Sequence, residues 1–266
     1  MSYKIAIPSY HRNIIIQTHT LAFLTKNKID SALIYIFIVE EDLPLYNEIP
    51  TELYNQLIIG EKGLVQQREF IERYFEQDSH IIFIDDDIKY LLFSVEKYET
   101  LDIFFKFCFE TCIKEYAFIF GLYPVGNAFF AERNNLYSTQ LTYICGALYG
   151  VINRMNNPEC IITRENGNKE DVERSIKYFF KDGKVIRFNT VCIVTKYYNS
   201  VGGLGRLSDR IHSMQLLSEL LHKEYPTITK VKVRKNGLYE IVLNDHTGKT
   251  MKKTKEYFVP DNNGVL

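Results

Sequence analysis

The stretch His80–Ile88, HIIFIDDDI, decides the fold expected for this chain. Residues 81–84 form an unbroken apolar run, which is typical of a strand buried on both faces of a parallel sheet. Three acids follow at once, and charged side chains do not continue into a dry core. We therefore place Asp85, Asp86 and Asp87 just beyond the carboxyl end of the strand, at the edge where open α/β sheets bind their ligands.

The acids have a specific chemical use. Asp85 and Asp87 are two positions apart, so the alternation of side chains along extended backbone puts both on the same side. Two carboxylates so placed can hold a hard divalent cation against a diphosphate, with the cation acting as a Lewis acid. The alternative is a solvated acidic turn, because an isolated pair of this spacing is common. Other parts of the sequence are needed to decide between a metal site and a solvated turn.

Composition and charge limit the number of domains and the kinds of partner that the chain can have. The chain has 266 residues, of which 46% are hydrophobic, enough for one large domain or two small ones with a sizeable core. A net charge of -1 gives no global electrostatic reason to bind nucleic acid or a membrane surface. The charge is unevenly distributed, however: residues 226–256 carry eight Lys/Arg against three Asp/Glu, so this segment is +5 and the remainder is -6.

Cysteine usage indicates the redox compartment of the protein, and hydropathy indicates whether it spans a membrane. Five cysteines are odd in number and lie mostly among apolar residues, unlike a secreted disulfide framework. No signal peptide precedes the first expected strand, and no apolar run has the length of a membrane span. We expect a soluble protein of a reducing cytoplasm with no membrane partner.

Two further strands end in polar residues. Lys4–Pro8, KIAIP, is expected to be the first strand, with Ser9 and Arg12 in the loop behind it. Leu33–Val39 is a second apolar run and is followed by Glu40. Such loops can contact a nucleotide, although there is no glycine-rich phosphate loop. The alternative is an ordinary strand-to-helix turn.

The helix expected at about Leu64–Phe75 carries an irregularity. Its apolar stripe is interrupted by Arg68, beside Gln67. A buried arginine is tolerated when it is paired, so a structural ion pair is one interpretation. The other is a charge-assisted bond to Asp85 or to a bound nucleotide.

A second acidic site precedes the helix expected at Val172–Phe180. Asn168 is the expected N-cap, and Asp171 three residues later completes a variant of the capping box. Acids in a first helical turn are stabilised by the helix dipole, so a purely structural role is a strong alternative. The functional interpretation makes Glu170 or Asp171 a general base.

Small and basic residues later in the chain suggest an acceptor or phosphate site. Gly146 would let a ligand approach the backbone closely. The loop 202–205, GGLG, contains Gly203 and is followed by Arg206 and Arg210; it is no P-loop, but it has the composition of a lid. The helix expected at Leu207–Lys223 carries His212 and His222, each a surface histidine or a third metal ligand.

The last segment changes pattern. Residues 231–243 read as a β-hairpin turning at Asn236–Gly237, and 245–258 as a third strand of a basic meander. Its Lys252 and Lys253 either solvate an edge strand or contact phosphates. We expect a catalytic domain at residues 1–225 and the meander at 226–266.

These pieces together resemble a glycosyltransferase of the GT-A fold across residues 3–225. The resemblance is carried by IPSYHR (7–12), GLVQQREF (63–70), IFIDDDI (82–88) and KED (169–171), in this order. It implies an α/β, Rossmann-type sandwich with a mostly parallel central sheet and a small C-terminal β-meander. The run from 169 to 189, the GGLG loop and the meander further resemble TET-associated glycosyltransferases of phages and relatives of the base J glucosyltransferases.

The resemblance implies a role for each site residue. Asp85 and Asp87 would bind Mn or Mg on the diphosphate of a nucleotide-sugar donor, such as a UDP-sugar, and Asp171 would take the proton from the attacking hydroxyl, with inversion. Asp86 would touch the ribose. The rest of the nucleoside pocket would be Pro8, Ser9, Arg12, Glu40, Gln67 and Arg68.

The same resemblance implies an acceptor. Enzymes of that family attach a sugar to a hydroxymethyl group on a pyrimidine base in DNA, and a duplex base must flip to reach the cleft. Two other classes stay open. One is the same chemistry on a surface glycan or protein, and the other is an inactive binding module of the same fold. The sequence indicates neither the sugar nor the oligomeric state.

Overall fold

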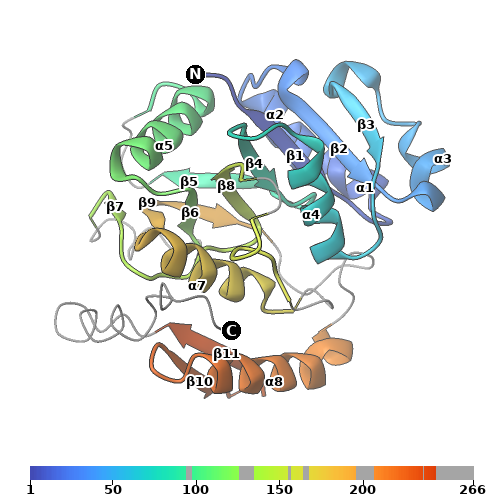
Figure 1. Cartoon of the computed structure of the whole chain (residues 1–266). Helices are drawn as coiled ribbons and strands as arrows, with labels where there is room; N and C mark the ends of the chain where they lie inside the picture. The colour runs from blue at the N-terminus through green and yellow to red at the C-terminus, as the bar shows by residue number, and fades with distance from the viewer. Residues whose placement is uncertain are drawn as a thin grey trace.

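A nine-stranded mixed sheet forms the centre of the molecule (Figure 1). The computed structural model describes residues 1–93, 98–125, 135–154, 157–163, 168–195, 207–235 and 237–243. The strand order is β3-β2-β1-β4-β8-β6-β9-β5, and β7 pairs with β9. Strands β1, β2, β3, β4, β6 and β9 run in one direction, while β5, β7 and β8 oppose them. The expected mostly parallel α/β sheet is confirmed.

The strands of the sheet have the following bounds: β1 Lys4–Pro8, β2 Ile34–Ile38, β3 Gln56–Ile59, β4 His80–Ile84, β5 Tyr90–Phe93, β6 Ile119–Tyr123, β7 Tyr137–Ser138, β8 Leu148–Ile152 and β9 Ile186–Val194. The helices are α1 Asn13–Ile16, the π-helix η1 Gln17–Leu21, α2 Ala22–Lys26, α3 Leu43–Tyr46, α4 Leu64–Tyr74, α5 Leu101–Glu115, α7 Glu170–Asp182 and α8 Leu207–Glu224. Short 3-10 turns are η2 Ser31–Leu33, η3 Glu40–Asp42 and η4 Thr51–Leu53.

Helices cover both faces of the sheet, as the apolar strand sequences require. In β1, Ile5 and Ile7 face one core with Phe104 of α5, whereas Ala6 between them faces a second core with Ile71 of α4. This alternation is the period-2 pattern of a strand buried on both sides. The first core also takes in α2, and the second takes in α7 and α8.

The reversed strand β8 determines what lies beside the three acids. It pairs antiparallel with β4, so its first residue, Leu148, lies opposite the last residue of β4, Ile84. The backbone just before β8 therefore meets the backbone just after β4, and Asp85 N donates to Ala147 O at 2.9 Å. Nothing in the local sequence indicated this reversal.

The C-terminal segment forms a separate antiparallel hairpin. β10 Thr229–Val233 pairs with β11 Tyr239–Leu243, and the two lie with α8 at one end of the molecule (Figure 1). The expected hairpin is confirmed, but in the described residues it is a two-stranded sheet of its own and does not join the central sheet. The expected third strand lies outside the described residues, and the domain boundary at 225 stays a prediction. None of the described helices has the length and apolar character needed to span a membrane.

Candidate functional site

The loop of three acids is tied to the fold by its backbone. The π-helix η1 presents the buried Thr20, whose Oγ1 donates to Asp85 O at 2.6 Å and accepts from Ile88 N at 3.0 Å. π-helical turns occur frequently at functional sites, where they redirect a side chain. Thr20 thereby fixes both ends of the acidic loop.

Asp86 is the buried member of the three. Ser9 Oγ donates to its Oδ2 at 2.6 Å, and Arg12 Nη1 donates to its Oδ1 at 2.9 Å. Burial raises the pKa of the Asp86 carboxyl to about 6, against the opposing effects of Arg12 and Ser9. Both oxygens thus have protein partners, and Asp86 anchors the loop behind β1 to the loop behind β4.

Asp85 and Asp87, the predicted metal ligands, both line the cavity described below. Asp87 accepts from Thr195 Oγ1 at 2.8 Å and from Arg12 Nη1 at 3.3 Å, and the Asp85 side chain is 35% exposed. The described residues contain no group of three His, Cys, Asp or Glu side chains arranged around one cation. A pair of carboxylates still fits Mg or Mn, because such ions take one or two carboxylates and complete their shell with substrate phosphates and water.

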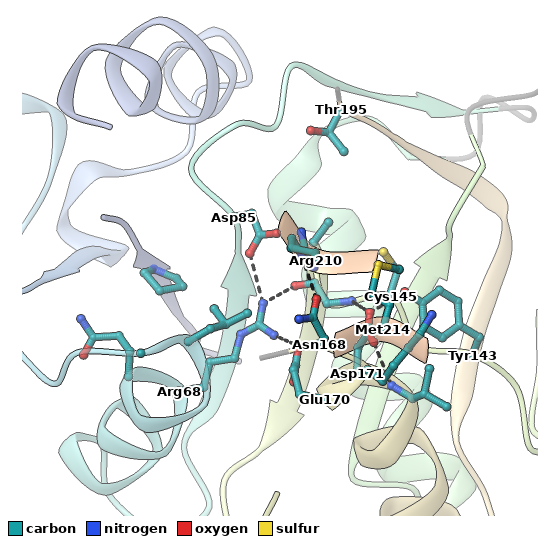
Figure 2. Close-up of a pocket in the computed structure, with 18 of the residues that line it drawn as sticks. Arg68, Asp85, Tyr143, Cys145, Asn168, Glu170, Asp171, Thr195, Arg210 and Met214 are labelled. Atoms are coloured by element: carbon teal, nitrogen blue, oxygen red, sulfur yellow. Dashed lines mark hydrogen bonds and ion pairs between the residues drawn. The ribbon is translucent and has the colours of Figure 1, made fainter. Parts of the chain in front are cut away.

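Arg68 connects the acids to the helix at residue 170. Its side chain is 4% exposed, and Nη2 donates to Asp85 Oδ1 at 3.1 Å and to Gly146 O at 2.7 Å. Its Nη1 contacts Glu170, and Figure 2 shows the guanidinium between the two acids. Both interpretations of the interrupted stripe are therefore met, because Arg68 bonds to Asp85 and also forms a buried ion pair with Glu170.

Glu170 is held in a buried ion-pair cluster. One of its oxygens contacts Arg68 and the other contacts Arg174, one turn further along α7. All three side chains are between 3 and 4% exposed. Both oxygens of Glu170 are thus engaged in buried ion pairs, so of the two predicted catalytic acids Asp171 is the candidate base.

Asp171 lies at the start of α7, but the cap expected there is wrong. The N-cap residue is Lys169, in the left-handed region at φ 64°, and it makes no side-chain capping bond. Asn168 instead donates to Ser213 Oγ at 2.9 Å and accepts from Arg210 Nε at 2.8 Å. The left-handed turn at Lys169 directs Asn168 toward α8 and away from the first turn of α7.

The carboxylate of Asp171 is held from the segment before β8. Its Oδ2 accepts from the Tyr143 hydroxyl and from Gly146 N, the latter at 3.4 Å, and Oδ1 accepts from Val172 N at 2.9 Å. The side chain is partly exposed and lines the same cavity as the acids after β4. Figure 2 shows Asp171 on the side of Glu170 that faces Tyr143.

One cavity of about 770 Å³ joins these groups. Its walls are the loops after β1 and β4, the start of α4, residues 141–147, the start of α7, parts of β9 and α8, and strand β11. A volume of this size is typical of a small-molecule site. Of the predicted site residues, the cavity is lined by Pro8, Ser9, Arg12, Gln67, Arg68, Asp85, Asp86, Asp87, Gly146, Glu170, Asp171 and Arg210.

The remaining predicted residues are placed elsewhere. Glu40 begins the 3-10 turn η3, is exposed and does not line the cavity, because the chain turns away from the sheet edge after Val39. His212 is exposed, and His222 Nδ1 lies 3.0 Å from Thr229 Oγ1; neither lines the cavity. The predictions for Gly203, Arg206, Lys252 and Lys253 concern residues outside those that the structure describes.

Several residues of the site were not predicted. Thr20, Tyr143, Arg174 and Thr195 contact its acids directly, and Arg187 lines the cavity from β9. For Thr20, Tyr143 and Thr195 the partners are distant in sequence, up to 108 positions for Thr195 and Asp87. Only Arg174 had a local signal, since it lies one helical turn after Glu170 and such pairs are neighbours on a helix.

Comparisons with known proteins support the fold. No protein-family model matches the chain, and no curated protein matches it in sequence. Among solved structures, S. aureus TarS 1-349 in complex with UDP-GlcNAc matches with a TM-score of 0.52 and 13% identity, over 84% of this chain and 67% of that one. Glucosyl-3-phosphoglycerate synthase from Mycobacterium tuberculosis, in complex with Mn2+, UDP-Glc and phosphoglyceric acid, matches with a TM-score of 0.46 and 10% identity, over 91% of this chain and 86% of that one.

The match to TarS is partial in length. This chain covers 66% of TarS 1-349 in a second structure and 40% of the longer TarS chain. The mixed sheet, the helices on both of its faces and the C-terminal hairpin agree with the expected architecture. The chain has the fold of the GT-A-type glycosyltransferases.

Proposed function

We propose that this protein transfers a sugar from a nucleotide-sugar donor, such as a UDP-sugar, to a hydroxyl group of an acceptor. One observation carries the proposal: the acids after β4 and the carboxylate of Asp171 line the same cavity, and Arg68 and Glu170 bridge the wall between them. Donor chemistry needs the first group, and activation of an acceptor needs the second.

Asp85 and Asp87 would hold Mn or Mg, which supplies charge neutralisation for the diphosphate leaving group. Thr195 and Arg12 orient the Asp87 carboxylate by hydrogen bonds at 2.8 and 3.3 Å. Arg12 and Arg68 line the same end of the cavity and hold these acids in place, Arg12 through Asp86 and Asp87 and Arg68 through Asp85. Pro8, Ser9 and Gln67 form the nucleoside end of the cavity, where Gln67 Oε1 accepts from Glu61 N at 2.8 Å.

Asp171 takes the proton of the attacking hydroxyl. Its Oδ2 is oriented by Tyr143 and Gly146, while the side chain still lines the cavity. One displacement assisted by a single carboxylate base gives inversion at the anomeric carbon. No protein acid is needed on the leaving side, because the divalent cation held by Asp85 and Asp87 would neutralise the diphosphate there.

For the acceptor we propose a hydroxymethyl group on a pyrimidine base of DNA. The resemblance of residues 169–189 to the TET-associated enzymes supports this, as does the +5 charge of residues 226–256. The base has to leave its stack so that the hydroxyl comes within hydrogen-bond reach of Asp171. Retention on DNA should then fall steeply with salt.

The donor half is tested by metal-dependent turnover. With Mn2+ and a panel of nucleotide-sugars, the protein should transfer or hydrolyse one donor, and Asp87→Asn and Asp171→Asn should each lower the transfer rate at least a hundredfold. Asp30→Asn is the matched control, because Asp30 caps η2 at the surface and asparagine caps equally well. A chain that binds donor without turnover is a binding module and contradicts the proposal.

The acceptor half is tested separately. Equal amounts of DNA with 5-hydroxymethylcytosine, unmodified DNA and a hydroxylated glycan are offered with the donor selected above. We expect sugar only on the hydroxymethylated DNA. Transfer to the glycan alone would keep the enzyme assignment and refute the DNA acceptor.

A further inference from the structure

Arg187 lines the proposed catalytic cavity from strand β9. Its side chain is partly buried, Nε donates to Asn189 Oδ1 at 2.9 Å, and the guanidinium carbon lies 5.3 Å from the centre of the Tyr123 ring. These two contacts fix the plane of the guanidinium group. The terminal Nη1 and Nη2 donors have no hydrogen-bond partner among the described residues.

The positive charge of Arg187 has no carboxylate partner in the described part of the chain. The other well-buried arginines all face carboxylates: Arg12 with Asp86, Arg68 and Arg174 with Glu170, and Arg154 with Asp182. No described carboxylate pairs with Arg187. Burial lowers the pKa of this guanidinium, while Tyr123 opposes the shift, yet an arginine stays protonated at neutral pH. A fixed, desolvated cation on a cavity wall favours an anionic ligand.

The position of Arg187 along β9 indicates which ligand carries that anion. Thr195, which contacts Asp87, follows the other end of the same strand. Eight residues of extended chain cover up to about 26 Å. Arg187 thus lies at the opposite end of β9 from the residue that contacts Asp87, and so away from the diphosphate of a donor held there.

Strand β7 connects Arg187 to Asp171, the proposed general base. Ser138 of β7 is the register partner of Arg187, and Tyr143, which bonds Asp171, comes five residues after it. Five residues reach at most about 18 Å, and the arginine side chain shortens the remaining gap. An acceptor with its hydroxyl at Asp171 can place a second group at Arg187.

We propose that Arg187 binds a phosphate group of the acceptor, through bidentate hydrogen bonds from Nη1 and Nη2. The site therefore selects a phosphate-bearing acceptor, which in DNA is a backbone phosphate near the modified base. This inference rests on the proposed function and names a recognition element for its acceptor. It assigns Arg187 no part in donor binding or in proton transfer.

The test uses the full chain, Mn2+, the donor identified above, and two short single-stranded oligonucleotides containing 5-hydroxymethylcytosine. One has ordinary phosphodiesters, and the other has uncharged methylphosphonate linkages around the modified base. Arg187→Gln should lower kcat/KM for the charged acceptor about ten- to a hundredfold, as expected for a lost charge-assisted contact. Its kcat/KM for the uncharged acceptor and its KM for the donor should stay unchanged.

Two further variants separate recognition from folding. Arg187→Lys keeps the charge but loses the bidentate geometry. Its kcat/KM for the charged acceptor should therefore lie between the values for the wild type and Arg187→Gln. Ser138→Ala is the matched control, because Ser138 Oγ is buried without a partner in the described chain and does not line the cavity. If Arg187→Gln lowers kcat/KM equally for both oligonucleotides, the role of Arg187 is structural and the inference is overturned.

A binding measurement decides the case independently of turnover. A fluorescein-labelled hexanucleotide is titrated with wild type and with Arg187→Gln, in the presence of UDP and Mn2+. At least tenfold weaker binding by the variant supports the phosphate site, and equal binding or no binding by the wild type refutes it. Donor hydrolysis without acceptor reports on the proposed function alone, so failure of the two proposals can be told apart.

Discussion

The hydroxyl of Tyr143 donates a hydrogen bond to the carboxylate of Asp171. The contact joins the segment before β8 to the first turn of α7, and it fixes the direction in which the proposed base faces the cavity. Gly146 N approaches the same carboxylate oxygen at 3.4 Å. The reversed strand β8 thus brings the backbone that orients the base next to the acids after β4.

Tyr143→Phe removes this donor and keeps the ring. We expect kcat for transfer to fall about tenfold, in line with the loss of one hydrogen bond to a charged group. The KM for the donor should not change, because the Tyr143 hydroxyl bonds to the proposed base, Asp171. Tyr74→Phe is the matched control, since the Tyr74 hydroxyl contacts Gln56 at the surface. A raised donor KM in Tyr143→Phe, with kcat intact, would contradict the assignment.

Glu170→Gln should cost stability. The substitution leaves the guanidinium groups of Arg68 and Arg174 buried without their shared counter-charge. Breaking such a buried pair costs about 3–5 kcal/mol in the free energy of unfolding. Urea denaturation measures this, with Glu159→Gln as the control, because Glu159 pairs with Lys181 at the surface and should matter by less than about 1 kcal/mol. Equal effects of the two variants would mean that the cluster is not coupled.

Gly146→Ala should disturb the same cluster from the backbone side. A Cβ at this position would lie 3.0 Å from both Arg68 Nη1 and Glu170 Oε1. Since both groups are confined, we expect a loss of about 1–3 kcal/mol in stability, together with slower transfer. Gly183→Ala is strained at φ +71° with nothing within 4 Å, so it should lower stability and leave turnover unchanged. In an Arg68→Met background only the close contact with Glu170 remains, so the cost of Gly146→Ala in unfolding free energy should become smaller.

The parts of the fold that the sequence predicted have strong local signals. The apolar runs of β1, β2 and β4 are continuous, and the acids at residue 85 mark the end of β4 sharply. Strands β5 and β7 span only Tyr90–Phe93 and Tyr137–Ser138, too short for a periodic pattern. The reversal of β8 is determined by pairing partners far along the chain, so no local pattern encodes it.

The candidate site likewise contains residues with a local sequence signal and residues whose contacts depend on distant parts of the chain. Arg68 was predicted as an inward cation, because a charge on an apolar stripe requires a partner. The bond from Tyr143 to Asp171 and the contact from Thr195 to Asp87 span 28 and 108 positions, and they exist only because β8 and β9 lie beside β4 and β6. Asn168 failed as a cap because the backbone at Lys169 adopts a left-handed conformation, which side-chain preference does not report.

Stability should depend on pH through Glu72, one helical turn after Arg68 on α4. Burial raises the pKa of the Glu72 carboxyl to about 7, against the opposing attraction of Arg174. In the unfolded chain a glutamate titrates near about 4.3, so between these values the folded state binds more protons than the unfolded state. The contribution of Glu72 to the free energy of unfolding is therefore fully present below about pH 4 and is lost as the pH rises to about 7.

Glu72→Gln isolates this contribution, because glutamine has nearly the same shape and no charge to desolvate. Urea denaturation of both proteins at pH 5, 6 and 8 gives the difference in unfolding free energy at each pH. The unfolding free energy of the variant should rise relative to that of the wild type as the pH rises, and the difference should level off once the pH has passed about 7 and the carboxylate of the folded wild type ionises. A difference that stays constant across the three pH values would mean that the folded state does not shift the titration of Glu72, and the charge of this side chain would then be solvated as it is in the unfolded chain.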